Sequence, residues 1–598
     1  MHKSASVSLA IVLSIGGVAC ATVSTAGPSV EMPADARLDA LADSYYQEQQ
    51  PLHPVSATGN GDNRYNDRYV VSFAPSVRAE LRAIDERTSR RLGEIPRASL
   101  DAQHRITYDV LRTTLASSLD GYRFPSQLLP LNQFYNFTAG FAQLGAGTGL
   151  HPFKTVKDYD DFLSRIRGFI DATDIAIANM RQGMAAGVMP PRVLMERTLP
   201  QLEAHIVSDP ATSLFYGPVR NMPASFSPSD RSRLTAAYSD AIRDRIVPAF
   251  RKLHAFVRDE YIPVTRSTAG YGALPDGAAW YAQLVRANTT TNLSPDSIHR
   301  LGLSEVARIQ AEMMRVKEQV GFKGSLKDCF TYLGNEPRFR YASREEMLAN
   351  FRAAKARIDP LTDKVFDFRP KADFEIRAIE PFRERSASAG SYEAASPDGT
   401  RPGIFYLNTY QPTTQTKFGM EDLLLHEGSP GHHFQVSVQR ELTGLPRFRR
   451  FRGFTAYSEG WGLYAESLGR ELGVYTDPYQ YYGMLAGELW RAIRLVLDTG
   501  IHSKGWSREQ AITYARENSS NSNEGIESEV ERFMAIPGQA LAYKMGQLKI
   551  TELRHRAERE LGPRFDLKKF HRAILENGPL PLDVLDARID GWIGEQKG

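Results

Sequence analysis

Cysteine and long apolar runs are scarce in this chain. Only Cys20 and Cys329 occur among its 598 residues. If Cys20 is lipidated or removed, no internal disulfide can form, and stability must come from core burial. Cys329 belongs to no recognisable motif, and we expect it to be a buried structural thiol. After residue 27, no segment approaches the ~20 uninterrupted apolar residues that a membrane-spanning helix requires.

Neither sign of charge dominates. The 73 lysines and arginines and the 70 aspartates and glutamates give a formal net charge of +3, which predicts a mixed solvated exterior and no nucleic-acid surface. With 42% apolar residues, the chain can bury a large core. We expect a mostly helical protein of two lobes, an N-terminal helical lobe over residues 28–320 and a C-terminal lobe over residues 321–598 that holds the chemistry.

Residues 1–27 have the layout of an export signal. Lys3 precedes a mostly apolar run from Val7 to Val18, and small residues follow. The four residues that end at Cys20 also resemble a bacterial lipobox, which would leave Cys20 as an acylated N-terminus. Plain signal cleavage after Ala21 or Ala26 is the alternative. Either way we expect an exported protein, in the periplasm or anchored to the outer membrane, with membrane contact only through a lipid on Cys20.

Helical periodicity dominates from about residue 34 onward. Thr155 and Asp158 form a helix start signal before apolar residues at helical spacing over 159–170. The same spacing predicts helices over Leu100–Leu115, Asp230–Tyr261, Asp296–Val320 and Arg344–Lys355. The best strand signal is the β-rich segment Gly403–Thr409.

Three histidines and a glutamate fall within eight residues, His426, Glu427, His432 and His433, although the whole chain has only 13 histidines. A hydrolytic zinc site usually takes three protein ligands, leaves one position for water and places a carboxylate beside that water as general base. The common helical form is His-Glu-x-x-His. This sequence begins that way but has Pro430 where the second histidine would stand.

A shared metal site therefore requires a break in the helix. On an unbroken helix, His426 would lie ~9 to 10 Å along the axis from His432 and His433, whereas two ligand nitrogens of one zinc ion are only ~4 Å apart at most. The intervening Gly-Ser-Pro-Gly sequence breaks helices. With Ser429 as N-cap and Pro430 as first residue, a new helix would place both histidines in its opening turn.

A third ligand is expected downstream. Residues 456–466 are predicted to be helical, with Glu459 and Glu466 on one face. Glu459 lies 27 residues after His432, which leaves room for one helix, a loop and a second helix packed alongside.

Together, His-Glu-Gly-Ser-Pro-Gly-His-His and the later Tyr-Ser-Glu-Gly-Trp resemble the bacterial family known as domain of unknown function number eight hundred eighty-five, many of whose members are regarded as candidate lipoproteins. That family in turn resembles the gluzincin metallopeptidases, such as thimet oligopeptidase, angiotensin-converting enzyme and the thermostable carboxypeptidases. The resemblance covers most of the mature chain, with its specific motifs after residue 390. It implies a two-lobed, helical gluzincin-like fold with a small β edge element near the site.

The resemblance also implies roles for individual residues. Glu427 would be the general base, and His426 and Glu459 would bind zinc. The second histidine ligand would be His432 or His433. Matching the Gly-His pair of gluzincin helices to the pair that ends at His432 favours His432. His433 would then orient the site by hydrogen bonding or pack beneath it.

Further residues complete the expected cleft. Residues 404–409 would be the edge strand along which a peptide pairs, with Tyr406 and Asn408 on one face, and Arg532 would also contact substrate. The gluzincin resemblance also implies that Tyr543 or His502 would donate a hydrogen bond to the developing oxyanion. The sequence thus predicts an exported zinc hydrolase that acts on peptides. An inactive peptide-binding or envelope protein, or a zinc hydrolase of esters or other amides, are the alternatives.

Overall fold

A computed structural model describes residues 32–598 except residues 135, 382 and 398–400. The predicted export signal and Cys20 lie outside the described residues. The chain is mostly helical, as predicted, and three strands form a small sheet. In the described part of the chain, no helix combines the length and the apolar character needed to cross a lipid bilayer.

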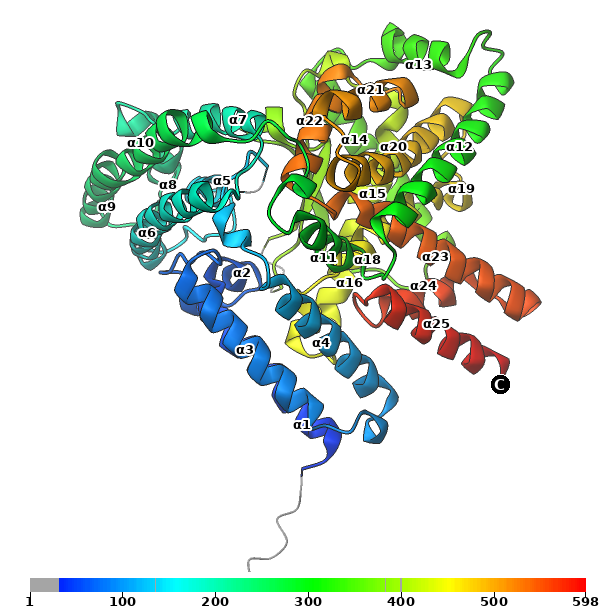
Figure 1. Ribbon diagram of the computed structural model, residues 1–598, viewed down its shortest axis with the longest axis horizontal. Coiled ribbons are helices and arrows are strands. Elements are labelled where there is room, and N and C mark those ends of the chain that lie inside the picture. The colour runs from blue at the N-terminus through cyan, green and yellow to red at the C-terminus, as the bar shows by residue number, and fades with distance from the viewer. Residues whose placement is uncertain (1–31, 135, 382, 398–400) are drawn as a thin grey trace, which may run out of the picture.

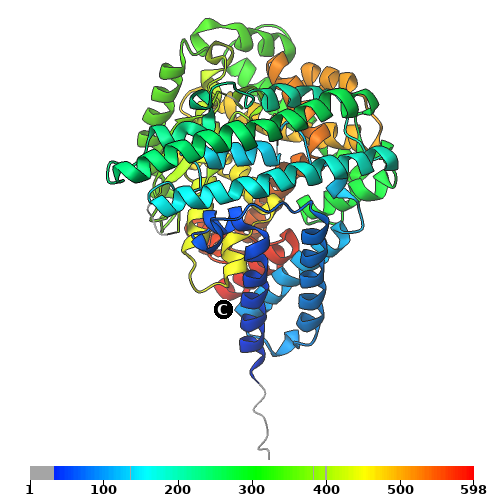
Figure 2. The same cartoon turned by 90° about the vertical axis from the view of Figure 1, so that its left-hand side faces the viewer.

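In the described part of the chain, residues 34–358 form the helices α1 to α14, with long helices over one face of the molecule (Figures 1 and 2). Their bounds are α1 Ala34–Gln49, α2 Pro54–Gly59, α3 Pro75–Gly93, α4 Ala102–Gly121, α5 Phe137–Gly145, α6 Val156–Ala186, α7 Arg192–Glu203, α8 Gly217–Arg220, α9 Pro228–Ala241, α10 Val247–Phe256, α11 Gly277–Thr289, α12 Pro295–Gln319, α13 Leu326–Asn335 and α14 Arg344–Ile358.

The second half begins with the strands and continues with helices only. The strands are β1 Phe374–Ala378, β2 Gly390–Glu393 and β3 Gly403–Leu407. The helices are α15 Met420–Glu427, α16 His432–Glu441, α17 Arg447–Phe451, α18 Thr455–Ser467, α19 Gly469–Leu472, α20 Pro478–Ser503, α21 Arg508–Asn518, α22 Asn523–Ala535, α23 Gln539–Leu561, α24 Leu567–Leu575 and α25 Leu582–Lys597.

The predicted helices are confirmed, and their start signals act as expected. The Thr155 side chain accepts from the backbone N–H of Asp158, and the Asp158 side chain accepts from the Thr155 N–H, which completes a capping box at the start of α6. Cys329 is buried at 2% exposure, also as expected.

The predicted edge strand is wrong in its position within the sheet. The strand order is β1-β3-β2, so β3 is central, parallel to β1 and antiparallel to β2. All five β3 residues are buried, as a strand paired on both sides requires. β1 and β2 have weaker β patterns than β3, so the sequence does not show that they flank β3 on both sides. β2 is an edge strand of this sheet.

The two largest cores do not follow the predicted division at residue 320. One core joins α5–α10 to α12, α20 and α22, and the other joins α1, α3 and α4 to α14–α18 and α23–α25. Each core therefore draws on both sides of that boundary. Helices far apart in the chain pack together, as α1 does with α17 and α4 with α25.

α18 and α23 pack closely because glycines face each other. A Cβ on Gly460 would lie 2.4 Å from the Gly546 Cα, and a Cβ on Gly546 would lie 1.8 Å from the Ala456 carbonyl oxygen. Contacts this short exclude any side chain at either position. The close approach sets the distance between Glu459 on α18 and Tyr543 on α23.

We predict that Gly546→Ala destabilises the protein by roughly 1–3 kcal/mol or more through overpacking. Gly591→Ala is the matched control because Gly591 is an exposed helical glycine with no heavy atom within 4 Å of an added Cβ. That change should raise stability by up to about 1 kcal/mol through helix propensity. Thermal unfolding of the two variants measures the difference, and equal melting temperatures would contradict the packing argument.

Candidate metal centre

The helix breaks between the histidines, as predicted, but it restarts later than expected. α15 ends at Glu427, and α16 begins at His432 with Gly431 as its N-cap. Ser429 does not cap α16, and the Ser429–Pro430 peptide bond is cis. His432 lies two residues beyond the position of the second histidine in His-Glu-x-x-His, and a turn takes up those two residues. His432 is therefore the first residue of the new helix rather than the third.

The turn packs directly against the end of α15. A Cβ on Gly431 would lie 2.0 Å from the His426 carbonyl oxygen and 2.3 Å from that of Leu425. Only glycine permits this approach, which folds the chain back on itself. The Trp461 indole N–H donates to the Pro430 carbonyl oxygen over 2.9 Å and fixes the turn to α18.

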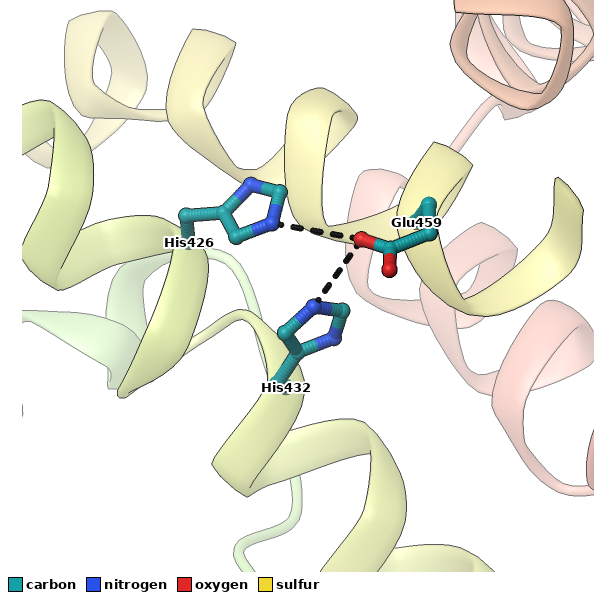
Figure 3. A group of neighbouring side chains, drawn as sticks. All are labelled: His426, His432 and Glu459. Atoms are coloured by element: carbon teal, nitrogen blue, oxygen red, sulfur yellow. Dashed lines mark ion pairs between the residues drawn. The ribbon is translucent and has the colours of Figure 1, made fainter. Parts of the chain in front are cut away.

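His426, His432 and Glu459 converge on one point (Figure 3). The Glu459 Oε2 lies 3.2 Å from the His432 Nε2 and 3.5 Å from the His426 Nε2. All three donor atoms are within 4.8 Å of one another. A zinc ion about 2.0–2.1 Å from tetrahedral ligands needs donor atoms about 3.4 Å apart. Two imidazole nitrogens and a carboxylate oxygen at these separations fit zinc.

His433 points elsewhere. Its Nδ1 lies 3.0 Å from the Tyr392 hydroxyl, and its ring centroid lies 4.6 Å from that of Phe374. Burial lowers the pKa of His433 to about 4, so it remains neutral. The structure thus brings His432, not His433, to His426 and Glu459.

Glu427 lies beside this triad. It is buried at 6% exposure, and its Oε2 has no hydrogen-bond partner among the described residues. Burial raises the pKa of Glu427 above its usual range. A buried carboxylate oxygen without a donor is costly, and a water or ligand proton would relieve that cost.

Behind His426 lies a group of buried charges that the sequence argument did not assign. The Glu466 Oε1 lies 2.7 Å from the His426 Nδ1, and it accepts a hydrogen bond of 2.8 Å from the Arg491 Nη2. Asp422 faces the same guanidinium. Burial, and then the charge of Glu466, raise the pKa of Asp422 well above its usual range. Glu466 orients the imidazole so that its Nε2 faces Glu459.

Tyr543 and Arg532 line the same cleft as the triad. The Tyr543 ring lies nearly parallel to that of His426, with centroids 6.1 Å apart. Burial raises the pKa of Tyr543 to about 12, so its hydroxyl stays protonated and can donate a hydrogen bond.

His502 is misplaced by the sequence argument. Its Nδ1 accepts from the Tyr271 backbone N–H over 3.0 Å, and its Nε2 donates to the Phe533 carbonyl oxygen over 2.9 Å. It is 1% exposed, and it is not among the residues that line the cleft. Both ring nitrogens are committed to backbone groups, so His502 ties three segments together.

Tyr406 and Asn408 also lie away from the triad. Tyr406 packs with Ile379 and Ile404 in a small core, and neither Tyr406 nor Asn408 lines the cleft. The Asn408 amide donates to the carbonyl oxygens of Glu384 and Ala387. Because β3 is central, these side chains support the loop before β2 and do not face the metal centre.

The cleft has a volume of about 840 Å³. It is lined by residues of α2, α5 and α7 and by residues of α15, α16, α18, α20, α22 and α23. The edge strand β2 lines it, from Gly390 to Tyr392. The candidate centre is therefore accessible to a ligand of peptide size.

Comparison with known proteins places the chain in a family. The sequence pattern of DUF885, described as a bacterial protein of unknown function, matches residues 54–589. The chain belongs to the DUF885 family. No curated protein matches. The family resemblance inferred from the two motifs is thus confirmed, and the DUF885 description carries no activity with it.

Two solved structures are similar to this DUF885 chain. A candidate lipoprotein from Colwellia psychrerythraea has a TM-score of 0.88 at 28% identity, covering 94% of this chain and 99% of that one. A candidate lipoprotein of unknown function from Shewanella oneidensis has a TM-score of 0.69 at 18% identity, covering 92% and 99%. The second likeness shows the fold alone.

We predict that Arg491→Ala destabilises the protein by about 3–5 kcal/mol, because it leaves a buried carboxylate uncompensated. Arg258→Ala is the control, since Arg258 pairs only with Asp259 on the surface. Differential scanning calorimetry should show a lower melting temperature for Arg491→Ala alone. An unchanged transition would mean that Asp422 and Glu466 do not need this cation.

Proposed function

We propose that this protein is a zinc-dependent hydrolase of peptides with a gluzincin-like site. The convergence of His426, His432 and Glu459, with Glu427 beside them in an accessible cleft, carries the proposal. Three protein donors leave one coordination position for water or substrate, the arrangement typical of catalytic rather than structural zinc.

Zinc bound by His426, His432 and Glu459 would supply Lewis acidity and lower the pKa of a water molecule. Glu427 would then accept the proton of the attacking water, since its buried Oε2 has no partner. The raised pKa of Glu427 suits a group that takes up a proton and returns it to the leaving amine. Tyr543 would donate its hydroxyl hydrogen bond to the developing oxyanion.

A peptide substrate is supported by the edge strand. β2 pairs with β3 on one side and lines the cleft, so its other side offers backbone groups to an extended chain. Main-chain pairing of this kind binds peptides with little demand on their side chains. This role moves from β3, where the sequence argument placed it, to β2.

We also propose export to the cell envelope. The two similar structures belong to candidate lipoproteins, and residues 1–27 have the composition of an export signal. Acylation at Cys20 would anchor the chain to a membrane surface.

We predict about one zinc per chain and different losses from the two neighbouring histidines. His432→Ala should abolish zinc retention, whereas His433→Ala should cost much less, because the His433 ring contacts Tyr392 and Phe374 rather than a proposed ligand. Zinc titration of the purified variants measures both. No uptake by the wild-type protein, or the reverse ranking, would contradict the proposed ligands.

Glu427→Gln should leave zinc bound and abolish peptide hydrolysis, because glutamine keeps the shape but accepts no proton. A peptide-library digest followed by mass spectrometry measures activity, and metal analysis of the same sample is the control. Full activity in this variant would contradict the mechanism. Zinc binding without turnover of peptides in the wild type would favour a binding protein or a hydrolase of esters or of non-peptide amides.

A further inference from the structure

Three arginines line the cleft on the side of α20 and α22. They are Arg491 and Arg494 on α20 and Arg532 on α22. Arg491 is paired with Glu466 and Asp422, whose carboxylate oxygens lie 2.8 Å and 3.9 Å from its guanidinium nitrogens. Arg494 and Arg532 are paired differently, with Glu529.

Arg494 and Arg532 share a single carboxylate, that of Glu529. The Arg494 Nη2 donates to the Glu529 Oε2 over 2.7 Å, and the Arg532 Nε donates to the Oε1 over 2.8 Å. The Trp490 indole N–H also donates to the Oε2, over 3.3 Å. Two guanidinium groups thus face one carboxylate whose oxygens are already occupied.

Arg494 has two guanidinium nitrogens that donate no hydrogen bond to the described residues. It is 8% exposed, and its Nε and Nη1 have no hydrogen-bond partner among the described residues. Arg532, by contrast, also donates to Gln539. Leaving the N–H groups of a buried cation unpaired costs free energy, more than for a neutral donor. An anionic ligand in the cleft would remove that cost, and a carboxylate matches the planar guanidinium.

The spacing relates Arg494 to the metal centre. The Arg494 Cζ lies 4.5 Å from the centre of the Tyr543 ring, whose centroid lies 6.1 Å from that of His426. One aromatic ring therefore separates the guanidinium from a metal-ligand histidine. An extended chain spans about 3.3–3.6 Å per residue, so one or two residues fit between the centre and Arg494.

We propose that Arg494, supported by Arg532, binds a carboxylate of the peptide substrate. This inference rests on the proposed function and narrows it. If the carboxylate is the chain terminus, the protein releases one or two residues from the carboxyl end. If it is the side chain of an aspartate or glutamate, the protein cleaves one or two residues before an acidic position.

A second cavity of about 1250 Å³ offers a different course for the substrate, in which the peptide runs past Arg494. Arg491 and Arg494 line this cavity as well as the cleft. A substrate that continued past Arg494 into it would be cleaved internally and would need no carboxylate. The unpaired Arg494 donors favour a carboxylate at the junction instead.

The first test measures how the wild-type zinc enzyme cleaves three peptides. The first has a free carboxyl terminus, the second has the same sequence with a neutral carboxyl-terminal amide, and the third is the amide with glutamate in place of the last residue. The loss of a charged hydrogen bond predicts a kcat/KM roughly 10–100-fold lower for the neutral amide. Recovery with the glutamate amide identifies a side-chain carboxylate, and no recovery identifies the terminus. Equal cleavage of the acid and the neutral amide would overturn the proposal.

The second test uses Arg494→Gln with Arg308→Gln as the matched control. In each variant the partner glutamate keeps another cation, Arg532 for Glu529 and Lys544 for Glu488. Arg494→Gln should lower kcat/KM for the acid roughly 10–100-fold, mainly through KM, and thereby remove the preference for the acid over the amide. Arg308→Gln should keep the preference. Retained preference in Arg494→Gln, with unchanged zinc content and melting temperature, would overturn the proposal.

A third measurement separates this inference from the proposed function. Titration calorimetry of the acid and the amide into the Glu427→Gln variant measures binding without turnover. Tighter binding of the acid supports the carboxylate site even if the wild type hydrolyses no peptide, in which case only the hydrolase proposal fails. Hydrolysis by the wild type with equal binding of acid and amide overturns the carboxylate site alone. Neither outcome depends on the folding of Arg494→Gln.

Discussion

The close approach of α18 to its neighbours is the constraint on which the candidate centre depends. Gly460 brings α18 against α23, and a Cβ on Gly462 would lie 2.7 Å from the His426 ring. The same helix carries Glu459, Trp461 and Glu466 within two turns. One helix position therefore fixes a donor oxygen, the turn between the histidines and the carboxylate that orients His426. A side chain at either glycine would displace all three together.

The surroundings of the site carboxylates separate their roles. Although burial opposes it, hydrogen bonding to His426 and His432 holds the pKa of Glu459 well below its usual range. Glu427 lies in the same cleft, and burial raises its pKa. Two carboxylates whose pKa values are driven apart can act as a permanent anion and a proton acceptor. Their identity as glutamates alone does not distinguish them.

The sequence was sufficient for features that depend on neighbours along the chain. Helical periodicity and the Thr155–Asp158 capping box located α6, and the helix-breaking residues predicted the turn before His432. It was insufficient where segments distant in the chain meet. His502 bonds to backbone groups near residues 271 and 533, and β3 is central only because β1 and β2 flank it. No local pattern contains those contacts.

The turn between α15 and α16 shows that spacing along a chain and proximity in space are separate properties. In the common motif, helical geometry itself brings two histidines together. Here the Gly431 backbone rests on the carbonyl oxygens of α15, and folding back replaces the missing i, i+4 relationship. A pattern that demands His-Glu-x-x-His passes over this protein. Families whose donors meet across a broken helix are therefore better sought by superposing side-chain atoms than by aligning letters.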